Sequence, residues 1–203
     1  MEGRIFVISG PSGTGKSSII KALRNQVNGL GYTISHTTRA PRSTEQEGVD
    51  YHFVDRDRFL RMIDSEGFVE WAEVYGHLYG TSFCSLNEQM SEGSDVLLDI
   101  DSQGADHVRS RFESSVLVYV LPPSLEVLEK RLRERGTDDE NTISRRMDEA
   151  IREIKNCTRY DYVIINEDLE CAIEHTKAIV VSDRCRTKRN ERLIRDRFGI
   201  RVP

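Results

Sequence analysis

Residues 5–17 read Ile-Phe-Val-Ile-Ser-Gly-Pro-Ser-Gly-Thr-Gly-Lys-Ser, an apolar run followed directly by a glycine-rich turn. From Gly10 onward this stretch matches G-x-x-x-x-G-K-[ST] at every fixed position, the pattern of a phosphate-binding loop. The glycines let backbone N–H groups close around a di- or triphosphate, and the helix that follows adds the positive end of its dipole. In this pattern Lys16 reaches the outer phosphates, and the Ser17 hydroxyl is a ligand for Mg²⁺.

A helical pattern follows the glycine-rich turn. Ile19, Ile20, Leu23 and Val27 recur at the spacing that places them on one face of a helix. An ordinary turn in a Gly- and Ser-rich segment is the alternative interpretation. The strand before the turn and the helix after it favour the phosphate site.

Length and composition indicate one well-buried core with room for an inserted lobe. The chain has 203 residues, of which 37% are hydrophobic and 31% charged. Its longest apolar runs, such as residues 116–121 and 178–181, are far shorter than the roughly 20 residues of a membrane span. No signal-peptide pattern precedes the first strand, so we expect a cytoplasmic protein.

The cysteines and histidines show no metal-binding pattern. Cys84, Cys157, Cys171 and Cys185 include no C-x-x-C pair, and no histidine lies at metal-ligand spacing. We therefore expect free thiols in a reducing compartment and no zinc site.

Apolar runs alternate with helical patterns, which is typical of a parallel sheet flanked by helices. Strands are expected at residues 5–9, 96–99, 116–121 and 162–165, with a shorter one at 32–35. Residues 35–93 break this alternation. There, segments 51–54, 68–74 and 79–81 predict short antiparallel strands around a small helix over Phe59 and Ile63. This block is interpreted as an inserted lobe.

The lobe begins with two arginines that suit a phosphate. Arg39 and Arg42 flank a proline, and guanidinium groups bind phosphate oxygens in a bidentate manner. Tyr51 and Tyr79 could add neutral hydroxyl donors. Each arginine taken alone is more often a surface charge.

Farther along the lobe, strand alternation predicts that Glu70 and Ala72 face away from Val69 and Trp71. A carboxylate that faces a pocket can accept two N–H donors from the edge of a base. An ordinary solvent-facing glutamate is the alternative.

The C-terminal residues are strongly basic although the net charge of the chain is −5. From Arg184 on there are eight Lys or Arg residues against Glu191 and Asp196. A contact with nucleic acid or with the acidic face of a second subunit is one interpretation. A solvated helical extension is favoured, since Phe198 is the only aromatic residue in this segment.

Together these stretches resemble the guanylate kinase family from about Arg4 to Val181. The matching segments occur in the family's order and spacing: ISGPSGTGKS, SHTTRAPR, DYHFV, FVEWAEVYG, YGT, LLDIDSQGA, LPPS, RLRERGTD, SRRM and DYVIIN. The resemblance implies an α/β fold with a three-layer P-loop NTPase core, a parallel sheet, an inserted GMP-binding lobe and a short lid. In residue terms we expect one domain over 1–203, with core 1–34 and 94–203, lobe about 35–93 and lid about 134–146. The basic extension 184–203 is expected from the charge distribution and lies beyond the resemblance.

The resemblance also implies an enzyme that transfers the γ-phosphoryl group of ATP to GMP, with Mg²⁺ as the cofactor. The partners implied are ATP and GMP. Neither a membrane nor a nucleic acid is expected as a partner, and the resemblance is compatible with a homo-oligomer. The ATP-binding residues implied are Gly10, Pro11, Ser12, Gly13, Thr14, Gly15, Lys16, Ser17, Ser18, Arg131 and Arg135. The GMP-binding residues implied are Ser35, Arg39, Arg42, Tyr51, Glu70, Tyr79, Thr81, Asp99, Asp101 and Arg146. Lys16, Arg39, Arg135 and Arg146 are the implied catalytic residues, and Ser17 is the implied Mg²⁺ ligand beside phosphates and waters.

Within the GMP set, Ser35, Glu70, Thr81 and Asp101 are implied to read the guanine, and Gly136 is a candidate lid hinge. Two positions depart from the family pattern. Residues 43–45 read Ser-Thr-Glu where the family usually has Pro-Gly-Glu, and Phe83 stands where bacterial members commonly have Arg.

Three other classes of protein fit the sequence less well. A peptide-binding scaffold of this fold typically lacks the phosphate loop, which is whole here. A kinase for another acceptor would not need the residues implied to read guanine. A GTPase would need an N-K-x-D motif, which the sequence does not contain.

Overall fold

The computed structural model describes residues 3–74, 76–90, 93–134 and 139–200. Five parallel strands form the central sheet, in the order β2-β7-β1-β8-β9. Their bounds are β1 Ile5–Ser9, β2 Leu30–Tyr32, β7 Asp95–Asp99, β8 Val116–Leu121 and β9 Tyr162–Ile165.

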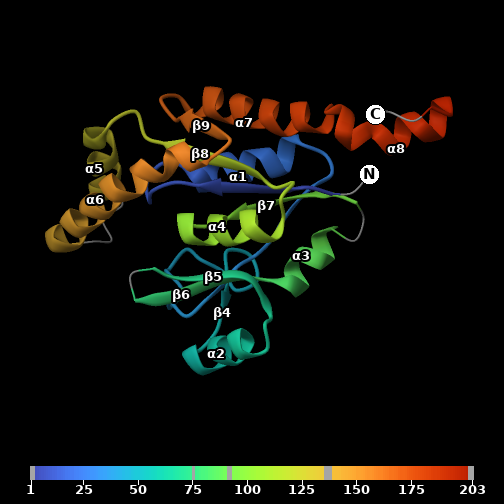
Figure 1. Ribbon diagram of the computed structural model, residues 1–203. Helices are drawn as coiled ribbons and strands as arrows, with labels where there is room; N and C mark the ends of the chain where they lie inside the picture. The colour runs from blue at the N-terminus through green and yellow to red at the C-terminus, as the bar shows by residue number, and fades with distance from the viewer. Residues whose placement is uncertain (1–2, 75, 91–92, 135–138, 201–203) are drawn as a thin grey trace.

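Helices cover both faces of this sheet and make three layers (Figure 1). Phe6 and Ile8 of β1 pack with α1 (Lys16–Gln26) and α7 (Leu169–Arg184) on one face. Ile5 and Val7 pack with α3 (Phe83–Met90) and α4 (Ser102–Arg111) on the other. Because β1 is buried on both faces, its sequence is continuously apolar.

The short strand expected at residues 32–35 begins and ends earlier, at Leu30–Tyr32. Leu30, Gly31 and Tyr32 pair with Asp95, Val96 and Leu97 of β7. The Thr33 N–H donates one more hydrogen bond to the Leu97 carbonyl before the chain leaves the sheet. A glycine in the middle of the strand weakens the local strand pattern, which explains the displaced prediction.

A second, four-stranded sheet with the order β4-β3-β6-β5 forms the lobe below the core in Figure 1. Its elements are β3 His36–Thr37, β4 His52–Phe53, α2 Arg56–Asp64, β5 Phe68–Val74 and β6 His77–Ser82. Phe59, Phe68 and Leu78 form its small core. β6 is antiparallel to β5, as expected, and also to β3, a strand that the sequence pattern did not predict. The expectation of antiparallel pairing is wrong for β4, which pairs with β3 in parallel. The connection over residues 38–51 is long enough for the crossover that parallel pairing requires.

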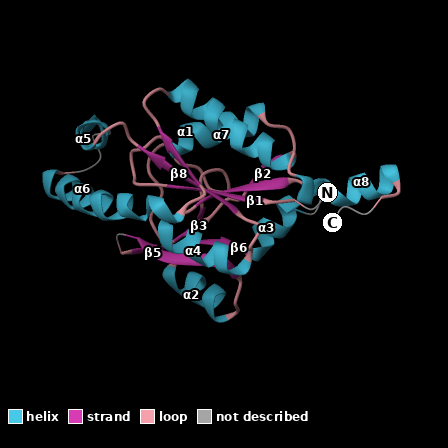
Figure 2. Cartoon of the chain, turned by 45° about the horizontal axis from the view of Figure 1, so that its top comes forward, coloured by secondary structure: helices cyan, strands magenta, loops and turns pink. Residues whose placement is uncertain are grey.

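The remaining helices lie at the two ends of the core (Figure 2). α5 (Leu125–Glu134) packs on α6 (Glu140–Ile154) through Leu128, Leu132 and Ala150, and the 3₁₀ helix Lys155–Arg159 follows α6. α3 falls within the range expected for the lobe, and its Leu86 side chain packs in the core. Among the described residues, no helix is long and apolar enough to cross a bilayer.

The last helix, α8 (Thr187–Phe198), extends away from the body and buries none of its residues completely (Figure 1). Its base is nevertheless tied to the core by Arg189, whose side chain is only 5% exposed. Arg189 Nη2 lies 2.6 Å from Asp95 Oδ1, and Nη1 lies 2.9 Å from Asp183 Oδ2. The interpretation of this segment as a solvated extension is therefore wrong at Arg189.

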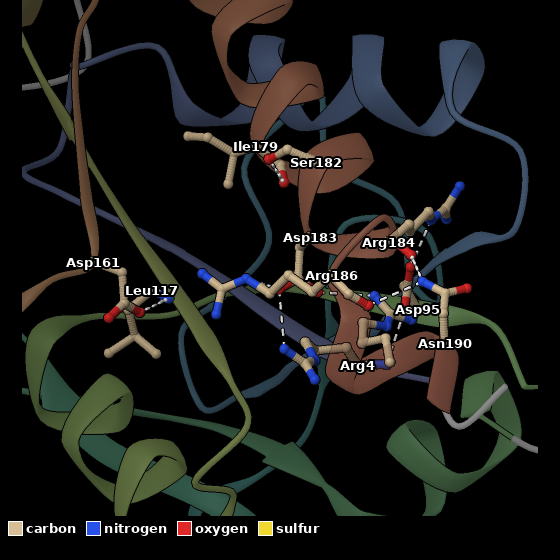
Figure 3. A network of polar contacts seen from close by, with 11 residues as sticks. Arg4, Asp95, Leu117, Asp161, Ile179, Ser182, Asp183, Arg184, Arg186 and Asn190 are labelled. Carbon is tan, nitrogen blue, oxygen red and sulfur yellow. Dashed lines mark hydrogen bonds and ion pairs between the residues drawn. The ribbon is translucent and has the colours of Figure 1, made fainter. Parts of the chain in front are cut away.

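Three more arginines complete the network around these two carboxylates (Figure 3). Arg184 Nε lies 2.7 Å from Asp95 Oδ2. Arg4 Nη1 and Arg186 Nε lie 3.0 Å and 3.2 Å from Asp183 Oδ1. Asp95 and Asp183 are buried, so each needs these cations to offset its loss of hydration.

We expect Arg189→Ala to lower the free energy of unfolding by about 3 kcal/mol, the lower end of the cost of breaking a buried ion pair, because Asp95 keeps Arg184 and Asp183 keeps two other arginines. Urea unfolding measures the change. The matched control is Arg192→Ala on the same helix. Its ion pair with Asp196 spans 3.8 Å between side chains that are 90% and 63% exposed. This control should cost about 0–1 kcal/mol. Equal losses in the two variants would contradict the clamp.

Candidate active site

The glycine-rich loop joins the end of β1 to the start of α1. Gly10 and Gly15 have φ values of +139° and +95°, which side-chain-bearing residues rarely adopt. A Cβ atom at Gly10 would also overlap the Val120 carbonyl oxygen, and one at Gly15 would overlap the Asn166 amide. Both positions therefore require glycine.

Asn166, directly after β9, holds the loop in place. Its Nδ2 donates a 2.7 Å hydrogen bond to the Thr14 carbonyl, and both residues are buried. The sequence motifs indicate no role for Asn166. The only signal was its place at the end of DYVIIN, directly after β9.

Lys16 begins α1, and Asp99 ends β7, the strand beside β1. Lys16 Nζ donates to the carbonyls of Gly10 and Pro11 at 2.6 Å and 3.1 Å. Burial raises the pKa of the Asp99 carboxyl, and the positive charge of Lys16 opposes that rise. The Ser17 hydroxyl, in the first turn of α1, is exposed on the same side of the sheet.

The lobe arginines are held by a carboxylate that is not among the site residues expected from the sequence, that of Glu45. Glu45 Oε1 and Oε2 accept hydrogen bonds of 2.8 Å and 2.9 Å from Arg39 Nη2, and Arg42 Nη1 lies 3.5 Å from Oε1. Arg39 Nε donates to the Tyr79 hydroxyl at 3.2 Å. The Glu45 N–H donates to the Arg42 carbonyl, so the turn closes despite Ser-Thr at residues 43–44.

Tyr51 completes the arginine cluster. The Arg39 guanidinium carbon lies 5.6 Å from the centre of the Tyr51 ring, and the Tyr51 and Tyr79 rings meet edge to face. Burial raises the pKa of the Tyr51 hydroxyl well above its usual range, so this group is a neutral donor at physiological pH.

A β-bulge in β5 sets the direction of Glu70. The pairing of β5 with β6 shifts between Phe68 and Glu70, so Phe68, Val69 and Glu70 are buried in succession. Val69 is 1% exposed and packs in the core, whereas Trp71 is 40% exposed. The expectation that Val69 and Trp71 share a face is therefore wrong. Arg111 Nη1 donates to the carbonyls of Phe68 and Val69 at this bulge.

The Glu70 carboxylate is buried at the back of the site with little to offset its charge. Oε1 accepts a 2.8 Å hydrogen bond from the Thr81 N–H, and the Thr81 hydroxyl lies 3.3 Å from that of Ser35. Burial raises the pKa of Glu70 from its ordinary 4.5 to about 7, helped by the negative charge of Asp101 and opposed by the Thr81 hydrogen bonds.

Asp101 begins α4. Its Oδ1 accepts a 2.9 Å hydrogen bond from the Gly104 N–H, and its Oδ2 accepts one from Gln103 Nε2. This is an N-cap, which satisfies a free donor of the first helical turn. Asp101 therefore has a structural role besides the one implied for it.

One cavity of about 480 Å³ joins the glycine-rich loop to the lobe. Most of the site residues implied by the sequence line it: Gly10, Ser12, Gly13, Gly15, Lys16, Ser17, Ser18, Ser35, Arg39, Arg42, Tyr51, Glu70, Tyr79, Asp99, Asp101 and Arg146. Pro11, Thr14 and Thr81 are buried and do not line it, and Arg131 does not line it either. Arg135 and Gly136 lie outside the described residues.

Of two further arginines on α5 and α6, one lines the cavity. Arg145 lines it beside Arg146, and only the SRRM segment signalled this neighbour. Arg131 Nη2 donates to the Asn166 carbonyl at 3.3 Å, and its buried Nη1 has no hydrogen-bond partner among the described residues. Phe83 does not line the cavity. It begins α3, and the Arg111 guanidinium lies over its ring.

The chain resembles proteins of one family along most of its length. A model of the guanylate kinase family matches residues 2–183. The chain is 44% identical over 199 residues to guanylate kinase of Geobacter metallireducens, a match that covers 98% of each chain. It is 45% identical over 188 residues to that of Carboxydothermus hydrogenoformans, covering 93% and 92%. A crystal structure of guanylate kinase from Anaplasma phagocytophilum matches with a TM-score of 0.77 at 35% identity and covers 98% and 96%. These likenesses confirm the expected P-loop core.

The burial of Glu70 predicts a pH-dependent stability. Because the pKa of this carboxyl is raised from 4.5 to about 7 on folding, the folded state binds more protons between these values. Its contribution to stability therefore falls as the pH rises through this window, by about 3 kcal/mol in all. Glu70→Gln keeps an acceptor for Thr81 and removes the charge. Urea unfolding should show this variant gaining stability over the wild type from pH 4.5 to 8. The control is Glu73→Gln, an exposed position of the same strand, and a pH-independent difference at Glu70 would contradict the prediction.

Proposed function

The chain belongs to the guanylate kinase family, and from this we propose that the cavity between loop and lobe holds ATP at one end and GMP at the other. The enzyme phosphorylates GMP with ATP as the donor, a reaction that gives ADP and GDP. One observation carries the proposed placement of the substrates. A single cavity runs from Lys16, in a phosphate-binding loop, to Glu70, a buried carboxylate in the lobe.

On the donor side, the backbone of the glycine-rich loop and the start of α1 would bind the ATP phosphates. The N–H groups of a loop at a helix N-terminus form such an anion site. Lys16 would turn from the loop carbonyls toward the phosphates. Arg131 offers a buried Nη1 that lacks a partner in the described chain, a donor that an anion could satisfy.

A kinase of this family needs a divalent metal, and Mg²⁺ is the ion we propose. The Ser17 hydroxyl and the ATP phosphates would hold it, with the remaining positions taken by water. The residues fit this ion, because Ser17 and Asp99 both line the cavity and both provide oxygen. When bound, Mg²⁺ neutralises part of the phosphate charge.

On the acceptor side, Arg39, Arg42, Tyr51 and Tyr79 would bind the phosphate of GMP. Glu45 and Tyr79 already fix the Arg39 guanidinium in one orientation, so little conformational freedom is lost when the substrate binds. The cluster combines two cations with neutral hydroxyl donors, which suits a dianion.

Guanine would lie against Glu70. Its N1–H and 2-amino groups are adjacent donors, and an ionised carboxylate can accept both. Adenine has an acceptor at N1 and no 2-amino group, so it would leave a buried carboxylate unpaired. Ser35 and Asp101 line the same part of the cavity, while Thr81 supports Glu70 from behind.

The reaction then depends mainly on charge neutralisation. Two unit charges 4 Å apart repel by about 4 kcal/mol at an effective dielectric constant of about 20, and both substrates carry several. The acceptor phosphate is already a deprotonated nucleophile, so no general base is needed. Lys16, Arg39 and Arg146 would position the phosphates and stabilise the transferring group. The role of Arg135 and closure of the lid over residues 134–146 stay predictions.

The base preference tests the guanine site. Wild-type enzyme assayed with GMP, AMP, CMP and UMP should use GMP almost exclusively, since sites built on polar pairing can reject a wrong ligand by about 10⁴ to 10⁵. Glu70→Gln should lower kcat/KM for GMP by about two orders of magnitude and narrow the GMP-to-AMP ratio. An unchanged ratio would mean that guanine is read elsewhere.

Substitutions at the two ends of the cavity should have different effects on phosphoryl transfer and on the use of GMP. Lys16→Ala should abolish phosphoryl transfer while urea unfolding stays close to that of the wild type, because the side chain acts on the phosphates. Arg39→Ala should weaken the use of GMP far more than the binding of ATP. Steady-state kinetics with both nucleotides varied, together with calorimetric ATP titration, measure this. Equal losses for ATP and GMP in Arg39→Ala would contradict the placement of the acceptor.

A further inference from the structure

α4 connects the two sheets. It lies between the central sheet and β5 of the lobe (Figures 1 and 2), and Ala105 and Val108 pack into the core. The end of the helix contacts the lobe through Arg111, which donates to the carbonyls of the β5 bulge. The start of the helix faces the Glu70 carboxylate. Both ends of α4 therefore influence the strand that carries this side chain.

The residue of α4 that meets the carboxylate is Gly104. Glycine is the least favourable helix-interior residue after proline, and alanine is the most favourable. The Gly104 φ angle is not among the positive values of the chain, so the helix backbone does not require glycine here. The residue lowers the stability of its own helix without a conformational reason.

The space beside Gly104 supplies a reason. A Cβ atom there would lie 2.5 Å from Glu70 Oε2 and 3.1 Å from Glu70 Cδ. The next neighbour, Ile100 Cβ, would be 3.3 Å away, which a small adjustment can accommodate. The severe overlap is thus with the carboxylate at the end of a flexible side chain.

Glu70 has little freedom to adapt where it is. Oε1 is fixed by the Thr81 N–H at 2.8 Å, and the neighbouring Asp101 carboxylate is held by the Gly104 N–H at 2.9 Å. If a Cβ atom at residue 104 displaces Oε2, the carboxylate must either rotate about its hydrogen bond to the Thr81 N–H or move into the cavity. In either case the two carboxylate oxygens of Glu70 no longer lie where they can both accept the donors of guanine.

We propose that Gly104 is a positioning residue for base selection: its missing side chain is the space in which the Glu70 carboxylate is held for guanine. This proposal rests on the proposed reading of guanine by Glu70. Gly104 touches neither substrate nor reacting atoms and acts through Glu70. Its replacement by alanine should consequently affect base choice without damaging the fold.

Gly104→Ala is the test, with Ser110→Ala on the exposed side of the same helix as the matched control. Thermal unfolding should show an unchanged or raised midpoint, because alanine favours the helix. The kcat/KM for GMP should fall by at least about tenfold, mainly through KM, while the value for AMP changes little and the GMP-to-AMP ratio falls. ATP affinity should stay within about twofold of wild type, since the donor loop is not involved. Ser110→Ala should match wild type in all four measurements.

Combining the variant with Glu70→Gln tests whether Gly104 acts through Glu70. On that background, Gly104→Ala should cost less than about threefold in kcat/KM for GMP, because residues that act as a unit are not additive. The full loss on both backgrounds, or unchanged GMP kinetics in the single variant, would overturn the proposal. A wild type that does not prefer GMP to AMP would instead overturn the proposed function.

A folding defect is also informative. If Gly104→Ala unfolds, the shorter side chain of Glu70→Asp should restore folding in the double variant, because it removes the overlap. Failure to restore it would show that alanine conflicts with another part of the fold, and the proposal would be wrong.

Discussion

The parallel pairing of β1 between β7 and β8 is the constraint from which the site follows. The chain leaves β1 toward β2 on one side and later returns to β8 on the other, so the sheet changes winding direction at β1. Ligands of open α/β sheets bind outside the carboxyl ends of the strands at such a point. The glycine-rich loop, Asp99 and Asn166 follow three different strands and meet at this edge because the strands run in the same direction.

Buried carboxylates have arginine partners in the core, whereas the buried carboxylate of the lobe does not. Asp95 and Asp183 each contact several arginines, which neutralise both buried carboxylates. Glu70 has hydrogen bonds from Thr81 and lies near another carboxylate, and its pKa is raised accordingly. The first arrangement holds elements together. An ionised Glu70 is costly in free energy unless a bound molecule brings N–H donors. Binding of such a molecule in the lobe would therefore favour ionisation of the Glu70 carboxyl.

Features set by local sequence were predictable, whereas those set by distant contacts were not. The loop motif fixes a strand, a turn and a helix within about 20 residues, and β1, β8 and β9 have the predicted bounds. The bulge at Val69 depends on packing against the core and on Arg111, neither of which is visible in alternation. Glu45 lies close to the arginines in the sequence, but the contact of both its carboxylate oxygens with Arg39 Nη2 requires the folded turn. Asn166 reaches a loop 152 residues away.

The clamp on α8 has a consequence for where this domain ends. The match to the family model stops at Asp183, yet that carboxylate and Asp95 are neutralised by Arg184, Arg186 and Arg189, all of which follow it. A chain shortened to the family boundary would keep Arg4 as the partner of Asp183 and lose the others. The residues that neutralise the buried carboxylates of the core thus extend beyond the end of the family match. They reach into α8, a helix whose remaining turns project away from the body.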